Sequence, residues 1–337
     1  MAARFWVGET GTWDATDTTH WSATTGGAGG ASVPTTADTI TFNASSGGGT
    51  CTVAATGAGT SMTCTGYTGT FSGTQLINLN AASGAIFTAG GSIEAGSNIT
   101  IVLTNNAASG SRTFNGGTGG EANSFSLSLS AGQAGCNVAI TTGTGVRDVT
   151  IGAGYVGAIA NNTRTIYGNL TVASATVAFT AGANVVTFAA TSAKTITTNS
   201  RTLDFPMAFN GVGGQWTFAD ALTQGSTRAF TITNGTVKLK AGVTSTVGAF
   251  ATSGATTKSL QSTSAGSAAT VSQASGTVNA SYLIIQDSTA TGGATWNATN
   301  SVDQGGNTGW FIYATDPSVQ GVGSSGVIQS FLNYGRI

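Results

Sequence analysis

Short runs in which apolar residues alternate with small polar residues recur along most of the chain. Period-two alternation sends successive side chains to opposite faces of a strand, and the Gly, Asn and Ser residues between runs are typical of turns. No segment keeps the i, i+3, i+4, i+7 spacing of an amphipathic helix over three turns. The pattern predicts an all-β chain with strands at TITF (39–42), TCTV (50–53), LINLN (76–80), ITIVL (99–103), FSLSLS (125–130), NVAITT (137–142), NLTV (169–172), VVTF (185–188), KTITT (194–198), RAFTIT (228–233), TVKLK (236–240) and YLIIQ (282–286).

Two architectures fit such short strands. Tandem β-sandwiches need hairpins, and FTITNGTVKLK at 230–240 carries the Asn-Gly pair typical of a hairpin turn. A parallel right-handed β-helix, or solenoid, stacks short strands into coils around a narrow apolar column, with small residues at the corners. The many very short runs and the abundance of small residues favour the solenoid, although no fixed repeat period is visible.

Charge is unusually scarce. Only 7% of the 337 residues are charged, the net charge is −1, and no charged residue lies between Asp38 and Glu94. The eleven Lys and Arg residues are scattered singly, whereas nucleic-acid binding needs basic residues clustered against phosphates. The scattered basic residues therefore indicate no nucleic-acid partner. Because 40% of the residues are hydrophobic and the net charge is small, the chain is expected to be ordered.

Five of the six tryptophans lie near the two ends of the chain. A solenoid exposes unpaired strand edges and an open core at its terminal coils, so large rings there are expected to cover the ends. We predict a capping segment at 1–34, a solenoid at 35–313 and a C-terminal arm at 314–337, with Trp13 and Trp296 buried near opposite ends. The predicted capping residues are Trp6, Trp13, Trp21, Trp296 and Trp310.

The arm combines a Gly/Ser-rich stretch with an apolar tip. Its apolar residues are Val327, Ile328, Phe331, Leu332 and Tyr334. This composition indicates either docking onto a neighbouring molecule or folding back onto the chain's own last coil.

The only histidine lies in WDATDTTHW, where Asp14, Asp17 and His20 could form a metal or acid–base site. No further cluster completes a coordination sphere, and the similar stretch TWNAT at 295–299 has Asn297 in place of Asp14. We therefore expect no metal and no cofactor, and interpret both stretches as a shared Trp-bearing turn.

A carbohydrate-binding or carbohydrate-cleaving β-helix is the main alternative function. Cleavage would need paired carboxylates, and binding would use a row of exposed aromatic rings such as Tyr67, Tyr155 and Trp216. The acidic residues are dispersed in the sequence, although neighbouring coils could still pair them: Glu121, Asp148, Asp204, Asp220, Asp287 and Asp303.

The three cysteines lack metal-ligand spacing. Cys51 and Cys64 lie in similar contexts and could stack on neighbouring strands, but buried free thiols are the preferred interpretation for both and for Cys136. The N-terminus lacks the apolar region of a secretion signal, and no run approaches the ~20 apolar residues of a membrane span.

The two ends carry a resemblance. Residues 1–46 resemble the start of a widespread group of phage and prophage structural proteins, in which an aromatic residue precedes Trp-Val-Gly-Gly-x-Gly-x-Trp and a Val-Pro-Thr-x-x-Asp stretch enters the first strand. Here Glu9 stands where glycine is usual, while Val33, Pro34, Thr35 and Asp38 fit. NSVDQGGNTGWFI (300–312) looks like their closing segment.

This resemblance implies a β-helical, homotrimeric virion protein and carries over no catalytic residue. The expected function is thus a non-enzymatic phage structural protein on the particle surface, as a capsid decoration or head fibre or as a tail fibre or spike, in assembly or host adsorption. Its expected partners are its own copies, other virion proteins and host surface glycan, and its location is the virion, assembled in the host cytoplasm. A bacterial adhesin is a further alternative.

Overall fold

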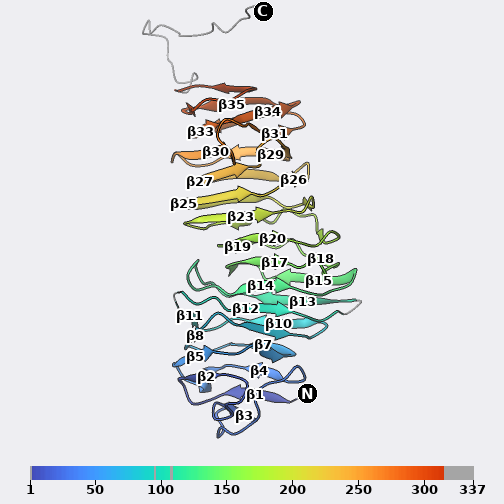
Figure 1. The fold of residues 1–337 in the computed structure, drawn as a ribbon, viewed down its shortest axis with the longest axis vertical. Coiled ribbons are helices and arrows are strands. Elements are labelled where there is room, and N and C mark those ends of the chain that lie inside the picture. Colours follow the sequence, from blue (N-terminus) through green and yellow to red (C-terminus); the bar gives the residue numbers. More distant parts are fainter. Residues whose placement is uncertain (1, 95, 107–108, 315–337) are drawn as a thin grey trace, which may run out of the picture.

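The computed structural model describes residues 2–94, 96–106 and 109–314 and is a parallel β-solenoid of about 12 turns. The coils stack along one long axis, with the N-terminus at one end and the last described coil at the other (Figure 1). The only helix in the described ranges is a short 3-10 turn, η1 (Ala44–Ser46). No described helix has the length and apolar character needed to span a bilayer.

One face of the first half is a nine-stranded sheet. Its strands are parallel, except that β3 pairs antiparallel with β1 at the N-terminal end. In chain order the sheet contains β1 (Ala3–Trp6), β3 (Trp21–Ser22), β4 (Thr39–Thr41), β7 (Ser61–Thr63), β10 (Gly84–Thr88), β13 (Ser109–Asn115), β15 (Gly135–Ile140), β18 (Ala158–Ile159) and β21 (Ala178–Phe179).

A second face runs almost the whole length as a sixteen-stranded sheet. Its main path contains β6 (Gly57–Gly59), β9 (Leu76–Leu79), β12 (Thr100–Leu103), β14 (Ser126–Leu129), β17 (Val149–Ile151), β20 (Leu170–Val172), β23 (Ala193–Thr197), β25 (Met207–Phe218), β27 (Ala229–Leu239), β30 (Lys258–Ser262), β33 (Leu283–Gln286) and β36 (Val302–Asp303). A side branch of β16 (Thr144–Val146), β19 (Arg164–Ile166), β22 (Val186–Phe188) and β29 (Ala249–Thr252) joins it through β25 and β27.

Three smaller sheets complete the coils. Near the N-terminus lie β2 (Gly11–Trp13), β5 (Thr50–Val53), β8 (Thr70–Ser72) and β11 (Ser92–Ile93). The second half adds β24 (Thr202–Leu203), β26 (Thr223–Gln224), β28 (Thr244–Thr246), β31 (Ala269–Gln273) and β34 (Ser288–Gly292), and then β32 (Thr277–Ser281), β35 (Thr295–Thr299) and β37 (Trp310–Ile312).

The core is a set of apolar columns that run through the coils. In the long sheet, one column stacks Ile77, Ile101, Leu127, Val149 and Leu170 on neighbouring strands, and all five side chains are buried. Successive side chains of a strand point to opposite faces, so these five residues point inward while the residues next to them in the sequence point outward. Hydrogen-bonded residues on adjacent coils are between 20 and 28 positions apart in examples such as Thr52 with Ser72 and Ser126 with Asn98. This variable coil length explains why the sequence shows no fixed period.

The predicted all-β parallel solenoid is confirmed, and each of the twelve predicted strand segments overlaps a strand. The sandwich alternative and its hairpin at 230–240 are wrong. Both halves of that segment belong to β27, which pairs in parallel with β25, and Gly235 bends the strand at a φ of 83°. The pair of residues Asn234 and Gly235 therefore forms a corner between two parallel stretches, with no chain reversal.

Candidate functional site

The N-terminal end of the solenoid is closed by an aromatic cluster. β1 and β2 pair in parallel with β4 and β5 as the first coil, and β3 runs antiparallel along the outer edge of β1, placing Trp21 opposite Trp6. Trp6 and Trp21 are completely buried and meet edge to face, with ring centroids 5.3 Å apart. Phe42 from the next coil stacks on Trp6 with centroids 5.5 Å apart. The segment 1–34 thus supplies both the first coil and the strand that covers it.

Glu9 is the residue that departs from the resembling proteins. Its φ is 61°, in the left-handed region that favours glycine. Its carbonyl oxygen accepts the Nε1 hydrogen bond of Trp6 at 3.1 Å. The bend is therefore present here with a glutamate, and it fixes the orientation of a buried indole.

Asp14, Asp17 and His20 build turns. The Asp14 carboxylate accepts backbone N–H groups of Asp17 and Thr16, which lower its pKa, and the Thr19 hydroxyl and amide lower the pKa of Asp17 in the same way. The His20 ring stacks on Trp6 with centroids 4.9 Å apart, and its Nε2 lies 3.9 Å from Asp17. No group of three His, Cys, Asp or Glu side chains suited to a metal occurs among the described residues.

The C-terminal end is built differently. Trp296 is 2% exposed and meets Trp310 with centroids 4.9 Å apart. The burial predicted for Trp13 and Trp296 is confirmed, since Trp13 is 1% exposed at the other end. The prediction that both stretches form a Trp-bearing turn is wrong for TWNAT. Residues 295–299 form the whole of strand β35, in which Asn297 lies beside Asn279.

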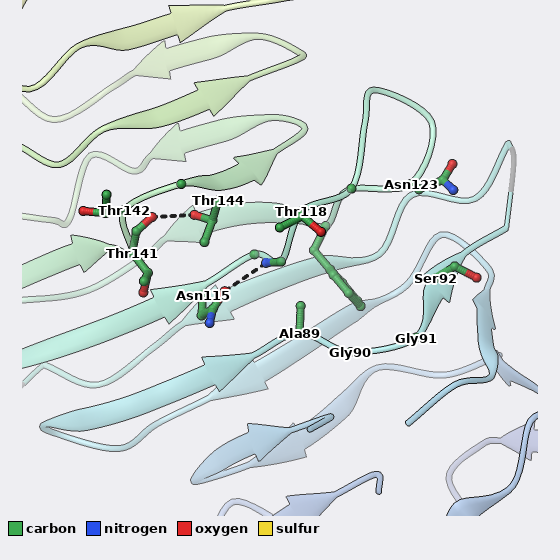
Figure 2. A pocket seen from close by; sticks show the side chains of 15 residues that line it. Ala89, Gly90, Gly91, Ser92, Asn115, Thr118, Asn123, Thr141, Thr142 and Thr144 are labelled. Carbon is green, nitrogen blue, oxygen red and sulfur yellow. Dashed lines mark hydrogen bonds between the residues drawn. The ribbon is translucent and has the colours of Figure 1, made fainter. Parts of the chain in front are cut away.

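A groove with a volume of about 490 Å³ lies on the side of the first half. Figure 2 shows it between the turn at residues 89–92 and the turn at residues 141–144, with Asn115 and Thr118 beside it. Its described lining offers hydroxyl, amide and backbone groups, and contains no carboxylate, imidazole or thiol. Such a lining can hold a polar ligand by hydrogen bonds.

Next to this groove, Glu121 fastens the loop at 116–125 across several coils. Its Oε2 accepts the Thr191 amide and hydroxyl, both at 2.7 Å, and its Oε1 lies 3.0 Å from Lys194 Nζ. Burial opposes ionisation, but the hydrogen bonds from Thr191 and the charge of Lys194 lower the pKa of Glu121 to about 2. Arg147 holds the same loop by donating to the Glu121 and Ala122 carbonyl oxygens. This carboxylate is committed to holding the loop.

A second, shallower groove of about 260 Å³ follows the outer face of the long sheet. Asp148 is its only acidic lining residue, and its Oδ1 accepts the Asn169 backbone and side-chain N–H groups at 2.7 and 2.9 Å. Asn169 Oδ1 in turn accepts the Thr195 amide. The polar groups here link successive coils to one another.

The remaining dispersed carboxylates are also used structurally. Asp204 forms an ion pair with Arg228 at 2.7 Å, Asp220 accepts the amides of Thr198 and Asn199, and Asp287 accepts the Gly266 amide. The aromatic residues named for a glycan-binding row are buried: Tyr67, Tyr155 and Trp216 are 3%, 0% and 0% exposed. The hypothesis that these three rings form an exposed glycan-binding row is therefore wrong.

Cys51, Cys64 and Cys136 are buried free thiols, as expected. Burial raises the pKa of Cys51 and Cys64. The alternative that Cys51 and Cys64 stack on neighbouring strands does not hold, because Cys51 in β5 pairs with Gly11 and Phe71, whereas Cys64 follows β7 in another sheet.

The predicted docking residues of the arm lie outside the described residues: Val327, Ile328, Phe331, Leu332 and Tyr334. The structural features that sequence reasoning missed are the Glu121 clamp and the large groove. Comparison of the chain with protein-family models, curated proteins and solved structures finds no match.

Proposed function

We propose that this chain is a non-enzymatic structural protein of a bacteriophage virion, displayed on the particle surface as a capsid decoration, head fibre, tail fibre or spike. The observation that carries the proposal is the closed N-terminal end of the solenoid. The rod of about 12 turns is sealed by buried tryptophans at its N-terminal end, which carries the longer of the two segments that resemble phage structural proteins. A rigid rod closed at its N-terminal end suits a projecting part that contacts other proteins through its sides.

The described surface gives this proposal indirect support. The two grooves contain one carboxylate between them, Asp148, and it is held by Asn169. Glycoside hydrolysis needs two carboxylates across one site. The proposed role is therefore assembly or host adsorption by contact. The proposed partners are the chain's own copies, in a homotrimer, and other virion proteins.

Immunogold electron microscopy tests the proposal. Antibody raised against residues 2–314 should label the surface of purified particles at regular positions. Label confined to the cell envelope, with none on particles, would favour the adhesin alternative. Depolymerisation of host surface glycan by the purified protein, abolished by Asp148→Asn, would replace the structural role with an enzymatic one.

Glycan binding is a second candidate, favoured by the groove of about 490 Å³ lined by Asn115, Thr118, Thr141 and Thr142. Gly143 lines this groove with open space around it, since nothing lies within 4 Å of a Cβ added there. Titration of host glycan fragments by NMR should move the resonances of this groove. Thr142→Trp should abolish the shifts, whereas Val212→Trp on a distant coil should leave them unchanged.

A further inference from the structure

The C-terminal end of the described solenoid is open and apolar. β37 is the last strand of its sheet, and among the described residues no strand pairs with its outer edge. Phe311 is 50% exposed, Val302 53% and Tyr313 37%. At the other end β3 covers the corresponding edge and the largest rings are buried. The N-terminal edge is thus covered by a strand, whereas the described C-terminal edge is unpaired and exposes apolar side chains, which a further segment could bury.

The residue types on the last strand, β37, differ from those at the paired positions of β32 and β35. Val278, Trp296 and Trp310 form one inward column, and the last of these rings is only partly buried because no described strand lies beyond β37. On the outward face, Asn279 and Asn297 are followed by Phe311. An aromatic ring thus replaces a polar side chain on the final rung alone.

The charge at this end is also distinctive. Asp303 occupies the rung after Ile285 in the long sheet, is exposed, and lies in a stretch, 295–314, without Lys or Arg. Its Oδ1 accepts from Gly305 and Asn307, which leaves the carboxylate charge unpaired by a cation among the described residues. The end surface is therefore apolar with one negative edge.

We propose that residues 327–334 of the same chain cover this end. The described chain stops at Ala314, directly after β37, and 23 residues follow, a length within the range of one coil. The segment brings Val327, Ile328, Phe331, Leu332 and Tyr334 to the apolar surface, and Arg336, the only charged residue after Asp316, to Asp303. This inference rests on the geometry of the end and does not depend on the virion proposal.

The connection favours the chain's own arm over a second copy. Residues 315–326 are Gly/Ser-rich, and a random-coil chain of about 12 residues with this composition has an end-to-end distance of about 17–21 Å. This matches the length of a five-residue strand such as β35, about 17 Å. A tether of matched length gives an effective concentration in the millimolar range, above that of a second copy at micromolar concentration.

Cysteine cross-linking of the full chain distinguishes the occupants, because the three native thiols are buried. In the variant carrying Phe311→Cys and Phe331→Cys, a short bis-maleimide should link the two positions within one chain. The product should keep the monomer mass on a denaturing gel, and mass spectrometry after digestion should find the peptide that joins positions 311 and 331. A control pairing Phe331→Cys with Val212→Cys, on an exposed residue of a distant coil, should give no link. Products of dimer or trimer mass, or equal linking in the control, would overturn the proposal.

Hydrogen exchange gives an independent test. Truncation after Ala314 should raise amide exchange in 310–313 at least tenfold while leaving the N-terminal coil unchanged. Phe331→Asp with Leu332→Asp should do the same in the full chain, and the matched pair Ser324→Asp with Ser325→Asp should not. Unchanged exchange at 310–313 in both the truncated and the Phe331/Leu332 variants would show that the arm does not cover the end.

Discussion

The indole of Trp13 occupies the space that a side chain at residue 57 would need: a Cβ on Gly57 would lie 2.5 Å from Cζ2 of Trp13. Gly57 begins β6, the first strand of the long sheet, and no described strand of the preceding coil lies beneath it in that sheet. The tryptophan ring therefore packs where the preceding coil would otherwise place a strand. Glycine in β6 and tryptophan in β2 are two parts of one end closure.

Adding a methyl group at residue 57 should consequently loosen the N-terminal end. We expect Gly57→Ala to lower the free energy of unfolding by about 1–3 kcal/mol, the usual cost of overpacking a filled core. Gly120→Ala is the matched control, because nothing lies within 4 Å of a Cβ there. Neither residue has a positive φ, so urea unfolding followed by circular dichroism compares the contacts alone.

A double-mutant cycle identifies the contact. Trp13→Ala alone should cost about 3–5 kcal/mol, as removal of a buried Trp usually does. In that background the cost of Gly57→Ala should disappear, because the ring that opposes the methyl group is gone. Additive costs in the double variant would contradict the proposed packing of Trp13 against Gly57.

The Glu121 clamp should open in acid. Its pKa of about 2 in the folded state lies below the ordinary 4.5, so its contribution is complete above pH 4.5 and is lost as the pH falls towards 2. Glu121→Gln removes the charge at every pH and should cost about 1.5–3 kcal/mol of local stability, the range for hydrogen bonds to charged groups.

Hydrogen exchange of the Thr191 amide, which donates to Glu121, measures this loss locally. Exchange in Glu121→Gln should be at least tenfold faster and should lack the acid dependence of the natural chain. Glu94→Gln, at an exposed position, is the control and should exchange as the natural chain does. Equal protection in all three proteins would mean that Glu121 does not hold the loop.

The sequence predicted the fold because alternation is a local signal that each strand carries. Residues such as Ile101 and Leu127 are marked as inward-facing by their polar neighbours, whichever coil precedes them. The same signal marks Trp216 as inward-facing. In QWTF it lies two positions before Phe218, on the same face of β25, and both side chains are buried.

Contacts between distant residues were beyond sequence reasoning. Glu121 and Thr191 are 70 positions apart, and only the coil lengths between them decide that they meet. Those lengths vary, so an error of a few residues in any coil would misplace the pair. The groove beside residues 141–144 depends on the same unknown lengths.

The buried thiols should be chemically silent in the folded protein. Cys51, Cys64 and Cys136 are buried, and burial raises the pKa of the first two, which disfavours the reactive thiolate. We expect Ellman's reagent to detect no thiol in the native chain and three in 6 M guanidinium. Rapid native reaction of even one thiol would show that its coil opens, and a reductant-dependent melting temperature would show a disulfide.

Gly235 shows why an Asn-Gly pair does not by itself specify a hairpin. Its φ of 83° turns β27 at a corner, and a Cβ at this position would lie 2.6 Å from the Gly214 carbonyl oxygen on the neighbouring coil. A hairpin turn would leave this position exposed to solvent, whereas stacked parallel corners bring backbone against backbone.

Gly235→Ala should therefore cost more than the strain of a positive φ alone. Gly242→Ala is the matched control, since its φ is 71° and nothing lies within 4 Å of a Cβ there. We expect about 1–2 kcal/mol for the control, the ordinary penalty of the left-handed region, and at least 1 kcal/mol more for Gly235→Ala. Urea unfolding measures both costs, and equal values would mean that the corner at Gly235 has room for a side chain.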